Sequence, residues 1–390
     1  MAIEMQMTAS LGSAELIPVR CTVMRGGTSK AVFLPAEVVP ESASARERFL
    51  LALMGSPDPR QIDGLGGADL LTTKVAIIGP STRKDADLDY TFAQVSVTRP
   101  EVYFDMNCGN ISSAVGVYAV EQGLIPSQEP LTRIRIHNRN THTVLLSDVP
   151  VKGNHALVEG DCTVDGVPGT GAAVKMDYHL TAGGATGSLL PTGHAQDVIA
   201  IEGWGEVRIS VVDIANVGFM VSAEDVGLDP SKIPAVPDQD LLRKMDALQR
   251  TVAKLLGMAQ GQLTPIPVIV APPHDFETIV GGVAVEADQV DIVSEVIGGQ
   301  PLTLHKAFPG TTSVTLAVAA KIPGTVAYEL ARKEDTHTVR IGHPSGRMEV
   351  GVRVSSSSSH DGSVVVDEAS YLRTARLLMD GITYLRRSRL

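Results

Sequence analysis

Short stretches of alternating apolar and polar residues recur along the chain, and this period of two is typical of half-buried β-strands. The first stretch covers residues 17–24 and leads into a glycine-bearing loop at 25–29. A serine-rich segment at 355–362 is predicted to be a polar hairpin turn. By the same criteria, further strands are predicted at 74–78, 89–97, 102–104, 131–137, 143–146, 207–212, 218–221, 267–271, 338–341 and 348–354.

Other segments space their apolar residues as a helix does. They cover 44–54, 110–122, 241–256 and 314–320. Because these helices and the strands do not alternate as steady β-α-β units, the sequence predicts an α+β fold. The glycine-rich run at 181–188 is the clearest break in composition, so we expect a domain boundary near it.

Two of the predicted helices begin in a similar way, 201 residues apart (310 minus 109). Gly109 opens one small and apolar run, Gly310 opens the other, and each run leads to an Ile-Pro pair. If the two segments are related, the chain holds two similar halves whose helix N-termini face one cleft. A chance likeness is the alternative, and the sequence by itself leaves both open.

Composition narrows the class of protein. With 390 residues, 44% hydrophobic and 20% charged, the chain can form a sizeable core, which excludes wholesale disorder. A formal net charge of −11 argues against a general nucleic-acid binder. No apolar run reaches the length of about 18 residues that a membrane helix needs. Residues 1–16 lack the pattern of a signal peptide, so a cytoplasmic location is predicted.

Cysteine chemistry centres on one residue. The three cysteines are too few for a disulfide framework, and they form no CxxC pair for zinc. Cys108 comes just before a predicted helix, where unpaired N–H groups and the helix dipole favour a thiolate. A buried structural thiol is the alternative for Cys108, and it is the interpretation we favour for Cys21 and Cys162.

A lysine stands at the edge of another predicted strand. Lys74 follows the polar, glycine-bearing run 63–73 and begins an apolar stretch. When such a lysine is partly desolvated, its pKa falls and it can serve as a base or an acid. The alternative is a surface lysine whose stem covers apolar neighbours.

Glycine-rich loops at 24–30, 64–67, 191–194 and 343–346 form a set. Glycine lets backbone N–H groups approach an anion, and Thr, Ser and Arg side chains add donors. None of the loops matches a phosphate-binding motif, and each alone is typical of a tight turn. Together they favour binding of small carboxylates. The histidines lack metal-ligand spacing and no GxSxG motif occurs, so neither a metal site nor a serine nucleophile is predicted.

A series of motifs in one order along the chain supports a resemblance. They are MRGGTSK (24–30), GSPDP (55–59), IDGLGG (62–67), NCGN (107–110), LPTG (190–193), APP (271–273), HPSG (343–346) and RTARLLMDG (373–381). From about residue 19 to this last motif, the chain resembles the family of 2-methylaconitate cis-trans isomerases and 4-oxalomesaconate tautomerases. That family is similar to diaminopimelate epimerase in fold. The resemblance implies two pseudo-symmetric α+β domains, each with a central helix wrapped by β-strands.

The resemblance also implies a domain organisation and a catalytic pair. The N-terminal epimerase-like domain would cover residues 1–184 and be completed by 371–390, and the C-terminal one would cover 185–370. In the epimerases a Cys-Gly pair starts each central helix. Here Cys108 matches the first such cysteine, whereas Pro309 replaces the second. The resemblance to the isomerase family instead implies a catalytic lysine and a catalytic cysteine, which are Lys74 and Cys108 in this sequence.

The implied reaction is proton transfer beside activated carboxylates, which shifts a double bond in a small unsaturated tricarboxylate. It requires neither a metal nor an organic cofactor. The run at 66–76 looks nearer to the oxalomesaconate branch, so 4-oxalomesaconate is the first candidate, although Ala31 and His194 depart from that branch. The alternatives are 2-methylaconitate, aconitate, or a relative that binds tricarboxylates without converting them. The expected partners are a small molecule and a second copy in a homodimer, with no nucleic acid and no membrane.

The expected substrate-binding residues lie in the glycine-rich loops and at the two helix starts. For Arg25 there is an alternative role, which is to anchor its own loop by an internal salt bridge. The set comprises Arg25, Gly26, Gly27, Thr28, Ser29, Gly66, Gly67, Thr73, Asn107, Gly109, Asn110, Thr192, Gly193, His194, Gly310, Thr311, Thr312, Ser313, His343 and Ser345.

Overall fold

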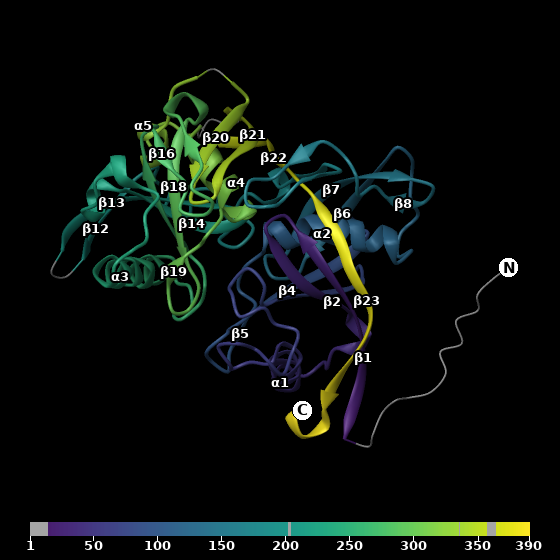
Figure 1. Cartoon of the computed structure of the whole chain (residues 1–390). Coiled ribbons are helices and arrows are strands. Elements are labelled where there is room, and N and C mark those ends of the chain that lie inside the picture. Colours follow the sequence, from purple (N-terminus) through teal and green to yellow (C-terminus); the bar gives the residue numbers. More distant parts are fainter. Residues whose placement is uncertain (1–14, 202–203, 335, 357–363) are drawn as a thin grey trace.

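A computed structural model describes residues 15–201, 204–334, 336–356 and 364–390. Figure 1 shows two lobes, with the end of the chain running from the second lobe back along the first. The expectation for residues 1–16 concerns a segment almost wholly outside the described residues, and so does most of the turn predicted at 355–362. Within the described part of the chain, no helix combines the length and apolar character needed to cross a membrane.

The first lobe winds its strands around one helix. Its elements are β1 (Leu16–Gly26), β2 (Ser29–Pro35), α1 (Ala43–Met54), β3 (Lys74–Pro80), β4 (Leu88–Val95), β5 (Val102–Tyr103), α2 (Gly109–Glu121), β6 (Leu131–Asn138), β7 (Thr143–Lys152), β8 (His155–Ala156), β9 (Cys162–Thr163), β10 (Thr170–Gly171) and β11 (Val174–Asp177).

The second lobe repeats this arrangement, and the last strand returns to the first lobe. The elements are β12 (Asp197–Ile201), β13 (Gly205–Ile214), β14 (Asn216–Ser222), α3 (Gln239–Leu255), β15 (Ile266–Ala271), β16 (Phe276–Glu277), β17 (Ala284–Val285), β18 (Ile292–Gly298), β19 (Thr303–Leu304), α4 (Gly310–Ala319), α5 (Val326–Leu330), β20 (Thr338–His343), β21 (Gly346–Ser356), β22 (Val364–Arg373) and β23 (Ala375–Arg386).

Strand pairing shows that the two lobes share one topology. In the first lobe, β1–β2 pair antiparallel, β2–β3 parallel, β3–β4 antiparallel, β4–β6 parallel and β6–β7 antiparallel. In the second lobe, β13–β14, β14–β15, β15–β18, β18–β20 and β20–β21 follow the same alternation. The helices α2 and α4 also take equivalent places, since each precedes the fifth strand of its series.

Strands exchanged between the lobes join them. β11 pairs with β7 in the first lobe and leads to β12, which pairs with β13 in the second. β22 pairs with β21 in the second lobe and leads to β23, which pairs with β1 in the first. β11 and β22 also pair with each other, so one continuous sheet runs through both lobes. The predicted boundary at 184/185 falls between β11 and β12, and it remains a prediction.

The two central helices are buried on all sides. α2 is buried from Gly109 to Val120 and α4 along its whole length, because both consist of small and apolar residues. Their side chains form one core that extends through both lobes. α1 and α3 pack on the outer faces of the sheet, where they close a separate core in each lobe.

Some elements lie outside the segments that periodicity predicts. They are β2, β8 to β12, β16 to β19, β22, β23 and α5, and the helix whose apolar pattern covers 314–320 begins at Gly310. The apolar pattern begins only at residue 314, because Thr311, Thr312 and Ser313 are polar. In the fold Ser313 donates to the carbonyl of Gly310 at 2.7 Å, which lets a polar turn be buried.

Candidate active site

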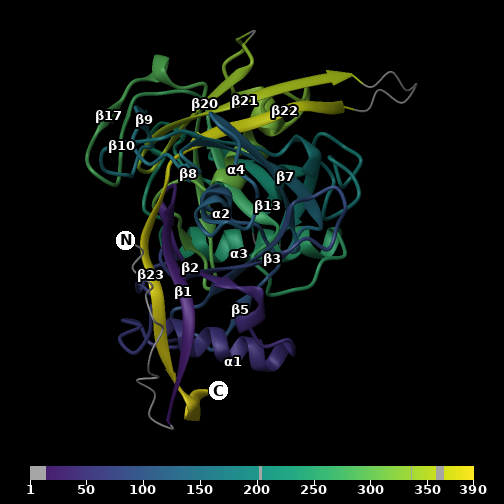
Figure 2. The same cartoon turned by 90° about the vertical axis from the view of Figure 1, so that its right-hand side faces the viewer.

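The N-termini of α2 and α4 meet between the lobes (Figure 2). A Cβ atom added to Gly109 would lie 2.6 Å from the backbone nitrogen of Thr311. A Cβ atom on Gly109 or Gly310 would also collide with the hydroxyl of Tyr371. Close approach of neighbouring atoms therefore requires glycine at both helix starts. The two similar sequence segments thus lie against each other in space.

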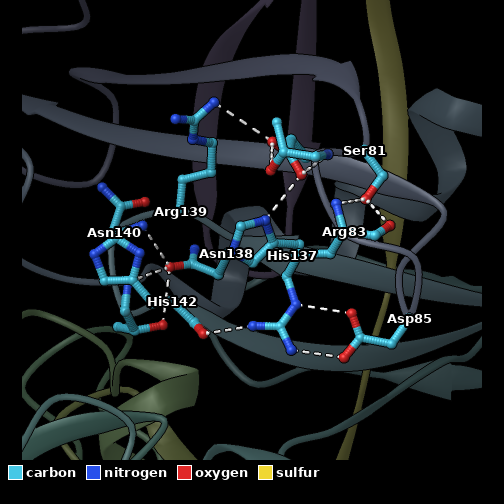
Figure 3. A network of polar contacts seen from close by, with 11 residues as sticks. Ser81, Arg83, Asp85, His137, Asn138, Arg139, Asn140 and His142 are labelled. Carbon is cyan, nitrogen blue, oxygen red and sulfur yellow. Dashed lines mark hydrogen bonds and ion pairs between the residues drawn. The ribbon is translucent and has the colours of Figure 1, made fainter.

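Buried asparagines connect the two helix starts. Asn216 Oδ1 accepts from the N–H of Asn107 at 2.8 Å, and its Nδ2 donates to the Asn107 carbonyl at 2.7 Å and to Thr311 Oγ1 at 2.9 Å. Asn107 Oδ1 in turn accepts from Asn138 Nδ2 at 3.1 Å. Figure 3 shows Asn138 within a wider network of polar contacts in the first lobe. Because these groups are buried and paired, the segment before α2 is held in one geometry.

Neither central helix is capped by a side chain. Cys108 is the N-cap residue of α2 and Pro309 that of α4, and neither accepts a hydrogen bond through its side chain. The N–H groups of the first turn and the positive end of each helix dipole are therefore available to an anion.

A small cavity of about 40 Å³ lies against these helix starts. Residues of both lobes line it, so it is an interlobe cavity. The first lobe contributes Leu70, Lys74, Gln94, Met106, Cys108 and Asn110, and the second contributes Leu263, Ile266, Val296, Gly298, Gly299, His305, Pro309 and Thr311. The fold thus brings Lys74 and Cys108 to one cavity.

Lys74 is the first residue of β3, and its side chain is buried in the wall of this cavity. Its Nζ donates to Gln94 Oε1 at 2.6 Å and lies 5.3 Å from the ring centroid of Phe92. Burial lowers the pKa of Lys74 below its ordinary value, although Cys108 and Asp69 favour the charged form. Such a lysine gives up its proton more readily than a surface lysine does.

Cys108 differs in setting from the other two cysteines. It is 7% exposed and faces the Lys74 cavity, whereas Cys21 lies in the outer core of the first lobe and Cys162 lines a different cavity. Burial raises the pKa of both Cys21 and Cys162. Cys108 is therefore the thiol that shares a cavity with the buried lysine.

His305 faces the same cavity and is missed by the sequence reasoning. It is 7% exposed, and its Nδ1 has no hydrogen-bond partner among the described residues. Burial, together with the charge of Lys74, lowers the pKa of His305 to about 4. The imidazole is therefore neutral at pH 7 and can exchange one hydrogen bond with a ligand. A single histidine without a motif gives no signal in the sequence.

Gln94 is a second residue that the sequence reasoning misses. Its side-chain amide nitrogen Nε2 donates to the carbonyls of Thr73 and Leu70 at 3.0 and 3.3 Å. These bonds leave Oε1 directed at the ammonium of Lys74. Gln94 therefore positions the lysine, a role that only the pairing of β3 with β4 reveals.

The loop at 25–29 packs against the start of α2. A Cβ on Gly26 would collide with the Asn110 carbonyl, and Gly27 has a φ of +48°. Arg25 Nη1 donates to the carbonyls of Gly27 and Thr374 at 3.0 and 2.8 Å. Arg25 therefore anchors its own loop, by hydrogen bonds to the backbone instead of the internal salt bridge considered above. Ser29 is buried in the same hairpin, with its hydroxyl unpaired among the described residues.

The loop before Lys74 is built by its own packing. A Cβ on Gly66 would collide with the side chain of Gln61, and one on Gly67 with that of Thr72. Thr73 Oγ1 accepts from Gln61 Nε2 at 2.8 Å. Gly66, Gly67 and Thr73 thus shape the segment that delivers Lys74 to the cavity, and none of the three lines it.

The predicted residues of the second lobe are not all brought together. At the start of α4, Thr311 lines the cavity, while the Thr312 hydroxyl is buried without a partner among the described residues. His343 lines a separate cavity instead. Ser345 is close to that cavity, and its hydroxyl donates to the carbonyl of Lys306.

The structure does not place Thr192, Gly193 and His194 in either cavity. The His194 side chain is 71% exposed and its ring faces Asp197 at 3.3 Å. Gly193 has a φ of +79°, as a tight turn requires, and no neighbour lies within 4 Å of a Cβ built on it. The glycine in this motif therefore serves the turn, and substrate binding by these three residues remains a prediction.

Across residues 15–390, leaving out the undescribed gaps, no group of three or more His, Cys, Asp or Glu side chains is arranged to hold a metal ion.

Comparison with known proteins gives a consistent set of similarities. The model of a family described as PrpF protein matches residues 16–386. A 3-methylitaconate isomerase of Eubacterium barkeri is 42% identical, with 95% of this chain and 98% of that protein covered. A (4E)-oxalomesaconate Delta-isomerase of Novosphingobium sp. (strain KA1) is 36% identical, with coverage of 94% and 97%. A 2-methyl-aconitate isomerase of Shewanella oneidensis is 34% identical, with coverage of 94% and 96%.

Solved structures show the same fold. The structure of a methylitaconate-delta-isomerase superposes with a TM-score of 0.77 at 40% identity and covers 96% of this chain and 97% of its own. A hydroxyproline epimerase from Agrobacterium vitis has a TM-score of 0.57 at 13% identity, with 95% and 93% covered. The second likeness concerns the fold alone, and it confirms the epimerase-like architecture.

Proposed function

Because this chain belongs to the PrpF protein family and is an isomerase, we propose that it shifts a carbon–carbon double bond in a small unsaturated polycarboxylate by proton transfer. The family resemblance drawn from the motifs is thereby confirmed. One observation supports the reaction most directly, namely a buried lysine of lowered pKa that shares an interlobe cavity with a thiol at a helix N-terminus.

In the proposed reaction Lys74 acts as the base and Cys108 as the acid. The free amine of Lys74 takes a proton from an allylic carbon, and the pair of electrons of that C–H bond forms the new double bond. The electrons of the old double bond move into the conjugated carboxylate as a dienolate. The Cys108 thiol then gives a proton to the far carbon, and a proton passed from the ammonium to the thiolate restores both groups. General acid–base groups of this kind contribute about 10²- to 10⁴-fold.

Backbone dipoles supply the remaining stabilisation. Negative charge develops on a carboxylate in the dienolate, and the uncapped first turns of α2 and α4 offer N–H groups to it. The neutral imidazole of His305 adds a further hydrogen-bonding group in the same cavity. Since these donors are fixed by the fold, they do not have to reorganise as the charge moves.

The first candidate substrate is 4-oxalomesaconate, which rests on the residues at 66–76. A second candidate, methylitaconate, is favoured by the lining of the cavity, where Lys74 is the one formal cation among the lining residues. Apolar side chains such as Leu70, Leu263 and Val296 form much of the remaining wall. A dicarboxylate with a hydrocarbon end suits this lining better than three carboxylates do. The named relative with 42% identity acts on that acid.

An assay with a panel of acids tests the proposal. Purified protein is mixed with 4-oxalomesaconate, methylitaconate, 2-methylaconitate and aconitate, and the ultraviolet absorbance of the conjugated system is followed. Conversion of at least one acid, unaffected by a strong chelator, is expected. Substrate-dependent incorporation of deuterium from solvent at the newly protonated carbon would report the proton transfer. If every acid binds and none is converted, the chain is a binding protein and the proposal fails.

The absence of a cofactor, the cytoplasmic location and the homodimer remain predictions. Sedimentation of the purified chain measures the assembly directly.

A further inference from the structure

A second cavity, of about 620 Å³, lies on the other side of the helix starts. It opens where β22 crosses between the lobes, and Thr28, Cys162, His343, Met348, Tyr371 and Arg373 are among its lining residues. None of the residues that line it also lines the Lys74 cavity. The proposed reaction therefore leaves this cavity without a role.

Arg373 is a buried cation without a counter-ion. It is 5% exposed, and no carboxylate in the described part of the chain lies within salt-bridge distance of it. Its Nε donates to Asn110 Oδ1 at 3.0 Å, Nη1 to the Leu372 carbonyl at 3.0 Å, and Nη2 to the sulfur of Met348 at 3.3 Å. These acceptors are all neutral. A guanidinium has five N–H groups, so two remain for another acceptor.

The titratable groups beside Arg373 do not supply the missing charge. Burial raises the pKa of the Cys162 thiol, even though Arg373 favours its thiolate. Burial also raises the pKa of Tyr371, whose ring lies 4.6 Å from the guanidinium carbon. Burial and the charge of Arg373 lower the pKa of His343 to about 3. Thiol, phenol and imidazole are therefore all neutral at pH 7.

We propose that this cavity is a second binding site, which takes the carboxylate of a small organic acid as the counter-ion of Arg373. A buried charge is costly unless it is paired, and the planar guanidinium fits a carboxylate through two parallel hydrogen bonds. Thr28 adds a donor, because its hydroxyl oxygen already accepts from Asn110 Nδ2 at 2.9 Å and its own hydrogen is free. The site communicates with the reaction through Asn110, which contacts Arg373 and also lines the Lys74 cavity.

The rim of the cavity carries both signs of charge. Lys175 and Arg347 lie there together with Asp161, Asp165 and Glu349, so the rim carries no excess of positive charge. At pH 7 succinate and inorganic phosphate carry similar negative charge, so a difference in their binding reports the fit of the anion to the guanidinium and not its charge. Succinate is therefore a suitable probe, with inorganic phosphate as its comparison.

Calorimetric titration of the full chain with succinate measures the number of sites. Two sites are expected in the wild type, one in Arg373→Met and one in Lys74→Met, because each variant retains the other cavity. Loss of the charge-assisted bonds weakens the affected site about 10- to 100-fold. The matched control is Arg347→Met, which removes a rim cation and retains both sites. Phosphate binding that equals succinate binding would show a site for anions in general and would contradict the assignment to a carboxylate.

A second variant covers the case in which Arg373→Met does not fold. Met348→Glu puts a carboxylate beside the guanidinium, so it should block succinate at this site and raise the melting temperature. Two sites that persist in either variant would overturn the proposal. A single site in the wild type that disappears in Lys74→Met, with the KM raised in Met348→Glu, would assign Arg373 to the substrate site instead.

Discussion

At the scale of single residues, Lys74 is distinguished by where its ammonium is held. Lys74→Met keeps a chain of similar length in the wall between Gln94 and Phe92, so the fold is expected to persist. Turnover should fall by about 10²- to 10⁴-fold, since the variant cannot exchange a proton. Steady-state kinetics with the converted acid measures this, with the exposed Lys84→Met as control. A loss of only a few-fold would reduce Lys74 to a binding role.

The same residue makes a prediction about pH. Burial lowers the pKa of Lys74, so the free amine forms at a lower pH than in an exposed lysine. If the amine is the base, kcat/KM rises with pH through this lowered pKa and then levels. A profile that falls through the same range would show that Lys74 acts as the acid and Cys108 as the base.

His305 contributes as a neutral hydrogen-bonding group. With a pKa lowered to about 4, its imidazole does not titrate between pH 6 and 8, and removing it should leave the shape of the pH profile unchanged in that range. His305→Asn should lower kcat/KM by about tenfold, which corresponds to the loss of one hydrogen bond to a charged group. His155→Asn, at an exposed position, is the control. An altered profile between pH 6 and 8 would contradict the neutral assignment.

At the scale of secondary-structure elements, the contact between α2 and α4 depends on glycine. Gly109→Ala places a methyl group 2.6 Å from the Thr311 nitrogen, inside the closest packing that side chains adopt. The free energy of unfolding is expected to fall by about 1–3 kcal/mol, as overpacked cores show. Gly298→Ala is the control, because nothing lies within 4 Å of its added Cβ and its φ is not positive. Urea unfolding of both variants makes the comparison.

The strand β18 carries a carboxyl group, that of Glu295, whose ionised form is destabilised by burial in the core. Glu295 is fully buried, its Oε2 accepts from the Ala235 N–H at 2.7 Å, and its Oε1 has no partner among the described residues. Burial raises the pKa of Glu295 from 4.5 to about 7. The folded chain therefore holds this proton more tightly than the unfolded chain. Its stabilising effect is complete below pH 4.5 and is lost as the pH rises through 7.

Glu295→Gln removes this pH dependence and keeps the bond to Ala235. The variant should therefore gain stability relative to wild type as the pH rises from 4.5 to 8, by roughly 3 kcal/mol in total. Urea unfolding at a series of pH values measures the difference, and the exposed Glu206→Gln should show none. A difference that stays constant with pH would show that Glu295 ionises as freely in the fold as in the unfolded chain.

At the scale of the whole molecule, the Lys74 cavity lies between the two lobes. Its volume of about 40 Å³ is far below the roughly 300 Å³ of ordinary ligand pockets. A larger cavity of about 420 Å³ adjoins it and shares Gln94 and His305 with it, so we expect substrate to enter from there as the lobes move apart. Asp69 of the first lobe and Lys306 of the second form an ion pair of 2.7 Å at the edge of the site. Hydrogen bonding by Lys306 and by the Leu71 N–H lowers the pKa of Asp69 in spite of its burial.

Breaking this ion pair should shift the chain toward the open form. Lys306→Met is expected to lower kcat/KM by up to about fivefold, because exposed ion pairs contribute at most about 1 kcal/mol. In the double variant Asp69→Asn/Lys306→Met, kcat/KM should be little lower than in Lys306→Met alone. Lys232→Met, which removes an ion pair within the second lobe, is the control. Additive effects of Asp69→Asn and Lys306→Met would show that the two residues act independently.

Local pattern was sufficient for the α+β class, for eleven of the 23 strands in the described part of the chain and for the starting segments of both central helices. The reason is that burial on one face dictates period two in strands, and burial on all sides dictates the small apolar runs of α2 and α4. Cys108 could be singled out because a helix start is visible in the sequence. Lys74 became a candidate because a polar run changes there to an apolar strand, and the family motifs then supported it.

Only the tertiary structure could decide which side chains meet. His305 and Gln94 carry no local signal, and Arg373 stands out only as the first residue of a family motif. Burial and charge pairing depend on neighbours that are distant in sequence, such as Asn110 beside Arg373. The glycines at 66, 67 and 193 look alike in the sequence, and only the structure shows that the first two pack against side chains whereas Gly193 takes the positive φ of a turn. The apolar pattern likewise could not predict that β23 returns to pair with β1, because strand pairing is set by the closure of the sheet around both helices.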